Sequence, residues 1–444
     1  GRAYFAQYFF QRKRTYRQPS RRGDRLFFKD EDGRFGSRKL FNYPTMKILV
    51  LTPRFPYPLI GGDRIRIYRV CKKLKEEGYS LTLLSFVASK KEREFVQHPD
   101  IQSVFSEIQT VFLPKWQSYF NSFVGIFRKP PLQISYYRSR EMARLVKQQL
   151  SSRHYYAVLA HLIRMAPYVI EQNNIRKVLE MTDALSLNYA RSKEQKLRGL
   201  LSVIYRFEEK RVKQYEQECI RNFDFSVVVS PNDKNYLLKE YPSPALENKI
   251  RIIPHGVLEE RMLEPRKKYD PNLIVFIGNL RTLQNTDAAL YFIEDIYPLV
   301  KKERPNARLR IIGDSPSRKI KSFNGRLGIE VASRVDNVVD YAKDACLSVC
   351  PVRIGAGIQG KILESMIMGV PVVATLLSAS GIYQAVPGKH LLCSDNPREF
   401  ADNVVNLMRD RDLRSKLAKD GYEFAREKFL YGNLVKEYPA LFSK

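Results

Sequence analysis

The chain has 444 residues, of which 44% are hydrophobic and 28% charged, a composition that suits two soluble globular domains of roughly 200 residues each. No run reaches the roughly 18 uncharged apolar residues of a spanning helix, which excludes a protein that crosses the bilayer through helices. No signal peptide is recognisable. The formal net charge of +29 attracts polyanions such as nucleic acid, anionic lipid surfaces and nucleotide or polyprenyl phosphates.

The basic residues are spread along the chain, and no helix-turn-helix, RNP or zinc-finger pattern appears. We therefore expect no nucleic-acid partner and favour an anionic membrane surface, with a generally basic proteome as the alternative explanation of the charge. Five cysteines include no C-x-x-C pair and five histidines are scattered. This pattern predicts buried thiols in a reducing cytosol and no metal site built by the protein.

Residues 1–45 differ from the rest, since they carry twelve Lys/Arg against four Asp/Glu and show no sustained periodicity. We expect this segment to be disordered. One interpretation is a basic arm that binds an anionic surface. The other is upstream sequence that is included because the start of the protein was assigned too early. We favour the second interpretation, because Met46 opens a strong strand pattern.

From residue 46 the pattern alternates between strands and helices. Asp63 is expected to cap a helix over 63–77 that Gly78 ends, and a long charged helix is expected over 193–221. Strands are predicted at 46–52, 79–87, 110–113, 156–160, 177–181, 225–230 and 250–254. This alternation predicts a parallel sheet with helices on both faces, as the first domain over 46–255.

Residues 256–272 are mostly charged, contain two prolines and are expected to be a linker. A second domain is expected over 273–429, with a helix over 286–301 and a helical tail from residue 397. Its strands are predicted at 273–278, 307–313, 328–332, 347–352, 370–375 and 390–393. The predicted fold class is therefore α/β, with two Rossmann-like, doubly wound parallel-sheet domains facing a cleft between the carboxyl ends of their strands.

Residues 351–375 combine a strand, a glycine loop and a short helix whose N-terminus favours a phosphate. Gly369 is expected to cap this helix. Gly355, Gly357 and Gly360 form G-x-G-x-x-G, which suggests a dinucleotide site, but that site needs an acidic residue about 20 positions on. No Asp or Glu follows the next strand until residue 395. The alternative uses Glu364, one turn into the helix, to accept hydrogen bonds from the hydroxyls of a ribose.

Arg353 and Lys361 bracket the glycine loop and are predicted catalytic residues. A reaction that expels a nucleoside diphosphate needs fixed positive charge where the leaving oxygen gains negative charge, and this pair would supply it without a metal. The alternative is a surface arginine and a Lys–Glu pair of small energy. Arg281, shortly after Gly278, is a weaker candidate for the binding site.

In the first domain, Gly61 and Gly62 follow the first strand and open the first helix, where backbone can approach a ligand closely. The alternative is a plain turn. His161 follows a predicted strand and is a third catalytic candidate, although a lone histidine is more often packed or solvated. Glu180 and Asp183 bracket the end of the next strand, and we expect the side chains of His161, Glu180 and Asp183 at the cleft.

The aromatic stretch 116–127, which is followed by Arg128 and Lys129, is expected to contact a membrane.

Together these motifs resemble the retaining nucleotide-sugar glycosyltransferases of the GT-B fold, and more narrowly the family-four group associated with polysaccharide and exopolysaccharide sugar transfer. The resemblance covers the chain from about residue 46. Its most specific part is KILESM at 361–366 followed by GVPVVA at 369–374; the other matching segments are the Gly61-Gly62 loop, IPHGV at 253–257, VFIGN at 275–279 and LRIIG at 309–313.

The resemblance implies that Glu364 is the second glutamate of an E-x7-E motif, which holds the donor ribose. The first glutamate, which contacts the sugar, would fall on Ala356, so the donor sugar is not implied. The family's Arg and Lys after the first strand of the second domain are replaced by Asn279 and Asn285. We propose Arg353 and Lys361 as their replacements.

The implied reaction moves a sugar from a UDP- or GDP-sugar to a lipid-linked or polysaccharide acceptor, with retention of configuration and no required metal or other cofactor. The diphosphate would lie on Gly355, Gly357, Ile358 and Gly360, and residues 430–444 would cross back onto the first domain. We expect a cytoplasmic protein, peripheral at the inner face of the membrane. The alternatives are an epimerase or hydrolase of the same fold, or an inactive sugar-nucleotide-binding partner, which Ala356 favours.

Overall fold

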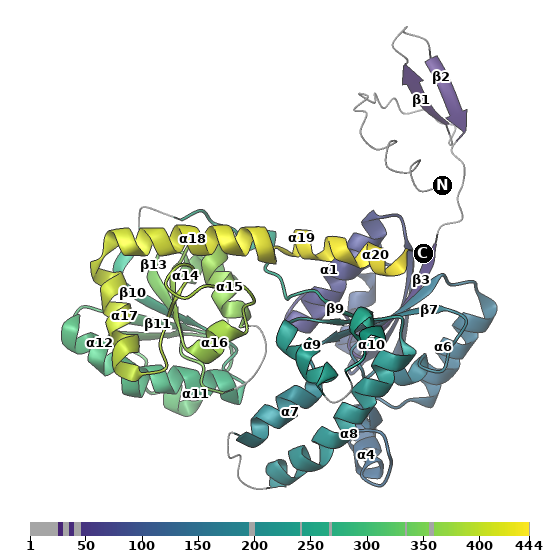
Figure 1. Ribbon diagram of the computed structural model, residues 1–444, viewed down its shortest axis with the longest axis horizontal. Coiled ribbons are helices and arrows are strands. Elements are labelled where there is room, and N and C mark those ends of the chain that lie inside the picture. The colour runs from purple at the N-terminus through teal and green to yellow at the C-terminus, as the bar shows by residue number, and fades with distance from the viewer. Residues whose placement is uncertain are drawn as a thin grey trace. The chain divides into compact units, whose positions relative to one another are not determined.

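The computed structural model describes residues 25–29, 35–39, 46–194, 200–239, 242–265, 269–333, 335–354 and 359–443 (Figure 1). Contacts divide the chain into two units, Gly1–Thr45 and Met46–Lys444. In the first unit, strands β1 (Arg25–Lys29) and β2 (Phe35–Lys39) pair antiparallel, in a segment where the sequence predicts no ordered structure.

In the second unit, the N-terminal domain is built on a seven-stranded sheet in the order β5-β4-β3-β6-β7-β8-β9, and every pairing is parallel. The near-continuous apolar runs of the central strands fit a sheet that helices cover on both faces. The strands are β3 (Lys47–Thr52), β4 (Ser80–Val87), β5 (Glu107–Phe112), β6 (Ala157–His161), β7 (Arg176–Thr182), β8 (Phe225–Val228) and β9 (Ile250–Ile252).

The helix predicted over 193–221 is present as α8 (Leu200–Asn222), but its predicted start is wrong, because Lys193 and Glu194 belong to the preceding helix α7 (Leu185–Glu194). Helix α7 ends at Glu194, α8 starts at Leu200, and the two pack against each other. The helices are α1 (Gly62–Glu76), α2 (Lys90–Glu94), α3 (Pro99–Val104), α4 (Lys115–Gly125), α5 (Leu132–Tyr136), α6 (Arg140–Ser152), α7 (Leu185–Glu194), α8 (Leu200–Asn222), α9 (Pro231–Leu238) and α10 (Pro244–Lys249).

The C-terminal domain has a six-stranded parallel sheet in the order β12-β11-β10-β13-β14-β15. Its strands are β10 (Asp270–Ile277), β11 (Arg308–Ile312), β12 (Ile329–Ala332), β13 (Ala345–Cys350), β14 (Val372–Ala374) and β15 (Leu392–Cys393). Its helices are α11 (Leu283–Tyr291), α12 (Tyr297–Glu303), α13 (Arg318–Lys321), α14 (Val338–Ala342), α15 (Gly360–Ile367), α16 (Leu376–Ser380), α17 (Pro397–Arg409) and α18 (Arg411–Phe429). The predicted α/β class with two parallel sheets is confirmed.

The chain ends in short helical segments that pack into the N-terminal domain: α19 (Tyr431–Leu434), the 3-10 turn η5 (Val435–Glu437) and α20 (Tyr438–Phe442). Helix α18 packs on α15, whereas Tyr438 and Phe442 lie in one core cluster with Val50 and Ile67 (Figure 1). The last residues therefore belong to the core of the first domain. Within the described ranges, no helix is both long and apolar enough to cross a bilayer.

Candidate functional site

The helix that follows the glycine loop starts where the sequence predicts it. Helix α15 begins at Gly360, after β13, and Gly369 ends it with a φ of +68°, a left-handed conformation that suits glycine. Because β13 and β14 are parallel neighbours, the N-terminus of α15 lies at the carboxyl end of this sheet. Gly355, Ala356, Gly357 and Ile358 lie outside the described residues.

The carboxylate of Glu364, predicted to bind a ribose, forms an ion pair with Arg261. Each of the two side chains is 28% exposed, so the pair is partly buried. Burial raises the pKa of Glu364, and the guanidinium of Arg261 opposes that change. Arg261 comes from a 3-10 turn (η3, Glu259–Arg261) inside the segment predicted to be a linker. The sequence did not identify Arg261 as the partner of Glu364. The only feature that pointed to Arg261 was the charged run that contains it.

Lys361 is held by the first strand and helix of the same domain. Its Nζ donates a hydrogen bond to Asn285 Oδ1 on α11 and lies 5.6 Å from the centre of the Phe276 ring. Burial lowers the pKa of Lys361. A Cβ at Gly278 would lie 3.1 Å from Asn285 Cγ, so glycine at this position leaves room for the amide that orients the lysine.

Arg353 is also held by α11. Its Nη2 and Nε donate to the two oxygens of Asp287, at 2.8 and 3.2 Å, and its guanidinium lies 4.0 Å from the centre of the Tyr291 ring. The hydrogen bond to Asp287 raises the pKa of Arg353. Arg281 is more exposed and pairs with Asp314 across 2.8 Å. The sequence predicts a helix in this region, over 286–301, but not that Asn285 and Asp287 of α11 (Leu283–Tyr291) would position the two predicted cations.

The glycine pair of the N-terminal domain opens α1 as predicted, with Gly61 at φ +95° in the N-cap position. The prediction that Asp63 caps this helix is wrong, because Gly61 occupies the N-cap position and Asp63 lies within the first turn. The Oδ2 atom of Asp63 lies 3.5 Å from Arg54 Nη1. A Cβ at Gly62 would lie 3.7 Å from His255 Cε1. The loop that contains Gly61 and Gly62 therefore packs against His255, next to the segment that joins the domains.

His161 is 3% exposed, and its buried Nδ1 has no hydrogen-bond partner among the described residues. Burial lowers its pKa to about 4, so the imidazole is neutral at pH 7. Glu180, expected at the cleft, is instead fully buried in an ion pair with Arg66. Asp183 lines a cavity, and burial raises its pKa to about 7.

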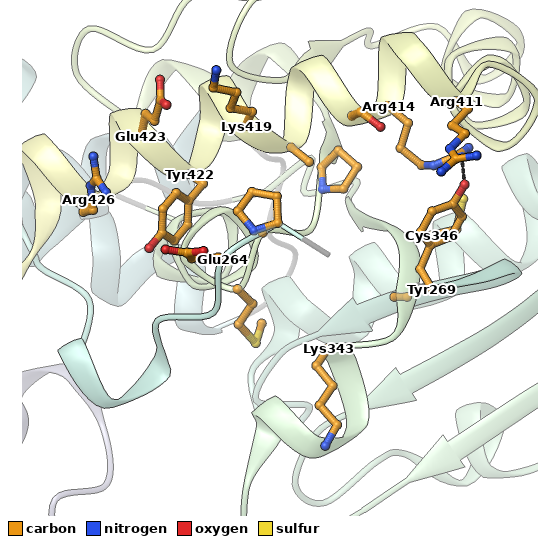
Figure 2. A pocket seen from close by; sticks show the side chains of 17 residues that line it. Glu264, Tyr269, Lys343, Cys346, Arg411, Arg414, Lys419, Tyr422, Glu423 and Arg426 are labelled. Carbon is orange, nitrogen blue, oxygen red and sulfur yellow. Dashed lines mark hydrogen bonds between the residues drawn. The ribbon is translucent and has the colours of Figure 1, made fainter. Parts of the chain in front are cut away.

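Two cavities differ in their position on the sheets. The larger one, of 480 Å³, lies at the amino end of β13 and beside the C-terminal end of α15 (Figure 2). Figure 2 shows Arg414 bonded to Tyr269 there. The smaller one, of 270 Å³, is lined by Arg54, Arg164 and Asp183 at the carboxyl ends of β3, β6 and β7. Because ligands of parallel α/β sheets bind at the carboxyl ends of strands, the smaller cavity and the α15 N-terminus are the functional candidates.

Comparison with known proteins agrees with this geometry. Residues 271–410 match the family described as Glycosyl transferases group 1. The chain is 21% identical over 415 residues to an uncharacterized 44.6 kDa protein in the cps region of Klebsiella pneumoniae, a match that covers 88% of this chain and 99% of that protein. It is 26% identical over 214 residues to an uncharacterized glycosyltransferase of Methanocaldococcus jannaschii, covering 46% and 56% of the two chains.

Solved structures share the fold. Sucrose-phosphate synthase from Thermosynechococcus elongatus superposes with a TM-score of 0.65 at 13% identity, over 89% of this chain and 98% of that one. Anabaena HepE in complex with UDP superposes with a TM-score of 0.61 at 12% identity, over 89% and 99%. The solved structures confirm the predicted GT-B fold. The matched family and the glycosyltransferase relative confirm the predicted class of enzyme, a glycosyltransferase.

Proposed function

We propose that this glycosyltransferase moves a sugar from a nucleoside diphosphate sugar to a lipid-linked or polysaccharide acceptor, with retention of configuration. The observation that carries the proposal is the placement of Glu364, with Lys361 one turn before it, at the N-terminus of α15 inside the matched domain. HepE has been solved with UDP-glucose, and S. aureus TarM with UDP and glycan ligands, which supports a nucleotide-sugar donor of the UDP class.

The proposed chemistry needs positive charge beside the departing diphosphate. The acceptor oxygen bonds to the anomeric carbon while the bond from that carbon to the diphosphate oxygen breaks, and the acceptor proton passes to the leaving phosphate. Lys361, partly buried, and Arg353, fixed by Asp287, stabilise the charge that develops on the leaving oxygen. Such a charge pair makes a metal ion unnecessary in this proposal.

Thermal shifts with UDP-, GDP-, ADP- and CMP-sugars, each with and without EDTA, test the donor and the metal. One nucleotide class should stabilise the protein equally in both conditions, and Glu364→Ala should remove that stabilisation. Glu423→Ala, in the cavity at the amino end of β13, is the matched control and should preserve it. Stabilisation by NADH alone would overturn the proposal. So would hydrolysis of the donor without transfer of its sugar to any acceptor.

We also propose that α4 rests on an anionic membrane surface. Trp116, Tyr119, Phe120 and Phe123 lie on one face of this helix and are between 61% and 71% exposed. The opposite face carries the buried residues Ser118 and Gly125, and Gly125 packs against Leu132 and Ser135 of α5. The large apolar residues of α4 therefore face outward and its small residues inward, the reverse of a helix that packs on a core.

The orientation of α4 is fixed by a neighbouring helix. Arg211 of α8 donates to the carbonyl oxygens of Gly125 and Pro130, at 3.0 and 2.7 Å. The aromatic face continues into exposed Ile126 and Phe127. Lys115, Arg128 and Lys129 flank this aromatic face, and aromatic rings between basic residues suit the interface of an anionic bilayer.

A further inference from the structure

The smaller cavity, here called the Arg54–Arg164 cavity, brings two arginines together at the carboxyl end of the first sheet. Its volume is 270 Å³, and Arg54, Asp63, Arg164 and Asp183 supply its charged lining. Arg54 is 53% exposed on its side chain and lies 3.5 Å from Asp63. Both arginines line this one cavity, and burial, with a further contribution from the nearby Arg54, lowers the pKa of Arg164.

Arg164 is held by a neutral side chain. Its Nε and Nη2 donate at 3.1 and 2.7 Å to one neutral oxygen, Gln133 Oε1, and its guanidinium lies 5.6 Å from the centre of the Tyr137 ring. Among the described residues, no carboxylate forms an ion pair with it. Burial is the main cause that lowers the pKa of Arg164, and the charge of Asp63 in the same cavity offsets that effect only in part. An anion bound in the cavity would supply the missing charge.

A line of aromatic rings leads from the cavity to the exposed face of α4. Tyr137, under Arg164, lies 5.0 Å from Tyr136, and Tyr136 lies 5.9 Å from Tyr119 on α4, measured between ring centres. One end of this line is an arginine pair and the other is the helix face proposed to meet the membrane. Such a path suits a ligand with an anionic head and an apolar chain.

We propose that the Arg54–Arg164 cavity binds the phosphate of a lipid-linked acceptor, with Arg164 and Arg54 as its ligands and the aromatic line beside its hydrocarbon chain. This inference rests on the proposed transfer to an acceptor and names the acceptor's chemical class. Asp183 and Asp63 lie in the same cavity and accept hydrogen bonds from the hydroxyls of the attached sugar.

The test measures binding of geranyl phosphate to the full chain by calorimetry, with UDP in excess so that the donor site is filled. Geraniol, inorganic phosphate and glucuronate are the comparison probes. We expect geranyl phosphate to bind at least about tenfold more tightly than each of them, because charge-assisted bonds and apolar contact act together. Tighter binding of glucuronate would assign the cavity to an acidic sugar, and equal binding of inorganic phosphate would assign it to the free anion; either result overturns the proposal.

Arg164→Gln should weaken geranyl phosphate binding about tenfold or more, and Arg54→Gln should weaken it as well. Lys419→Gln, in the other basic cavity, is the matched control and should leave it unchanged. Unchanged binding in both arginine variants, or an equal loss in the control, contradicts the proposal. Retained stabilisation by the donor in Arg164→Gln shows that the variant is folded. Geranyl phosphate binding without any response to nucleotide sugars would instead refute the proposed donor and leave this cavity's assignment standing.

Discussion

Arg66 on α1 donates a hydrogen bond from Nε to Glu180 Oε1 on β7 across 2.8 Å, with both side chains at most 1% exposed. The same arginine donates from Nη2 to the carbonyl of Ile253 and to the hydroxyl of Tyr438, at 2.8 and 2.9 Å. Tyr438 also donates to Glu180. This buried cluster ties the first helix, the inter-domain segment and the C-terminal helix to one strand.

Glu180→Ala should therefore lower the free energy of unfolding by about 3–5 kcal/mol, because it leaves the buried charge of Arg66 without its partner. Urea denaturation measures the change. An Arg66→Met/Glu180→Leu double variant should lose less than Glu180→Ala alone, since it removes both charges together. A loss in Glu180→Ala below about 1 kcal/mol would contradict this account of the cluster.

Arg261→Ala should weaken nucleotide binding, as we expect for Glu364→Ala, because the ion pair fixes the carboxylate that we propose binds the ribose. We expect a loss of about tenfold for each single variant. The double variant should lose little more than either one, since the two residues act as a unit. Calorimetry with UDP checks this, and fully additive losses would show that the two side chains act independently.

Combined alanine substitution of Arg353 and Lys361 should lower turnover by about 100-fold or more, with a smaller effect on donor affinity. The reason is that the leaving oxygen carries more negative charge in the transition state than in the bound donor. Arg409→Ala is the control, because its ion pair with Glu303 is largely exposed and neither residue belongs to the proposed site. Turnover of the double variant within a few-fold of wild type would show that the charge comes from elsewhere.

Glu216 on α8 gives a pH-dependent stability. It is fully buried, and burial raises its pKa from 4.5 to about 7. The folded protein therefore keeps a proton that the unfolded chain releases, so this residue lowers stability as pH rises from 4.5 to about 7.

Glu216→Gln lacks this titration. Its free energy of unfolding, relative to wild type, should rise by about 3 kcal/mol between pH 4.5 and pH 8. Denaturation at several pH values measures the difference, which isolates Glu216 from other titrating groups. A difference that does not change with pH would refute the raised pKa.

The outward face of α4 predicts liposome binding. Wild-type protein should float with vesicles that contain anionic lipid at low salt and should float less at high salt, because the flanking charges are then screened. Trp116→Ser/Phe120→Ser/Phe123→Ser should abolish flotation without loss of stability, since these side chains are exposed. Leu376→Ser, an exposed apolar residue on α16, is the control. Equal flotation of wild type and triple variant would rule out this surface.

Local sequence patterns determined most of the fold. The continuous apolar run of β3, the helix that follows Gly61 and the stop at Gly369 each depend on neighbouring residues, so each could be predicted. The helix predicted over 193–221 starts too early, because the boundary between α7 and α8 depends on how these two helices pack against each other. The position of Glu364 in its helix was likewise local and predictable.

The partners of these residues were decided by tertiary structure alone. Glu364 meets Arg261, which is 103 positions away, and Arg66 meets Tyr438, which is 372 positions away. No local pattern encodes such distant pairs, because they form only when the sheets bring separate segments together. The same reason explains why the sequence showed the aromatic stretch around Trp116 but not which face of α4 would be turned away from the core.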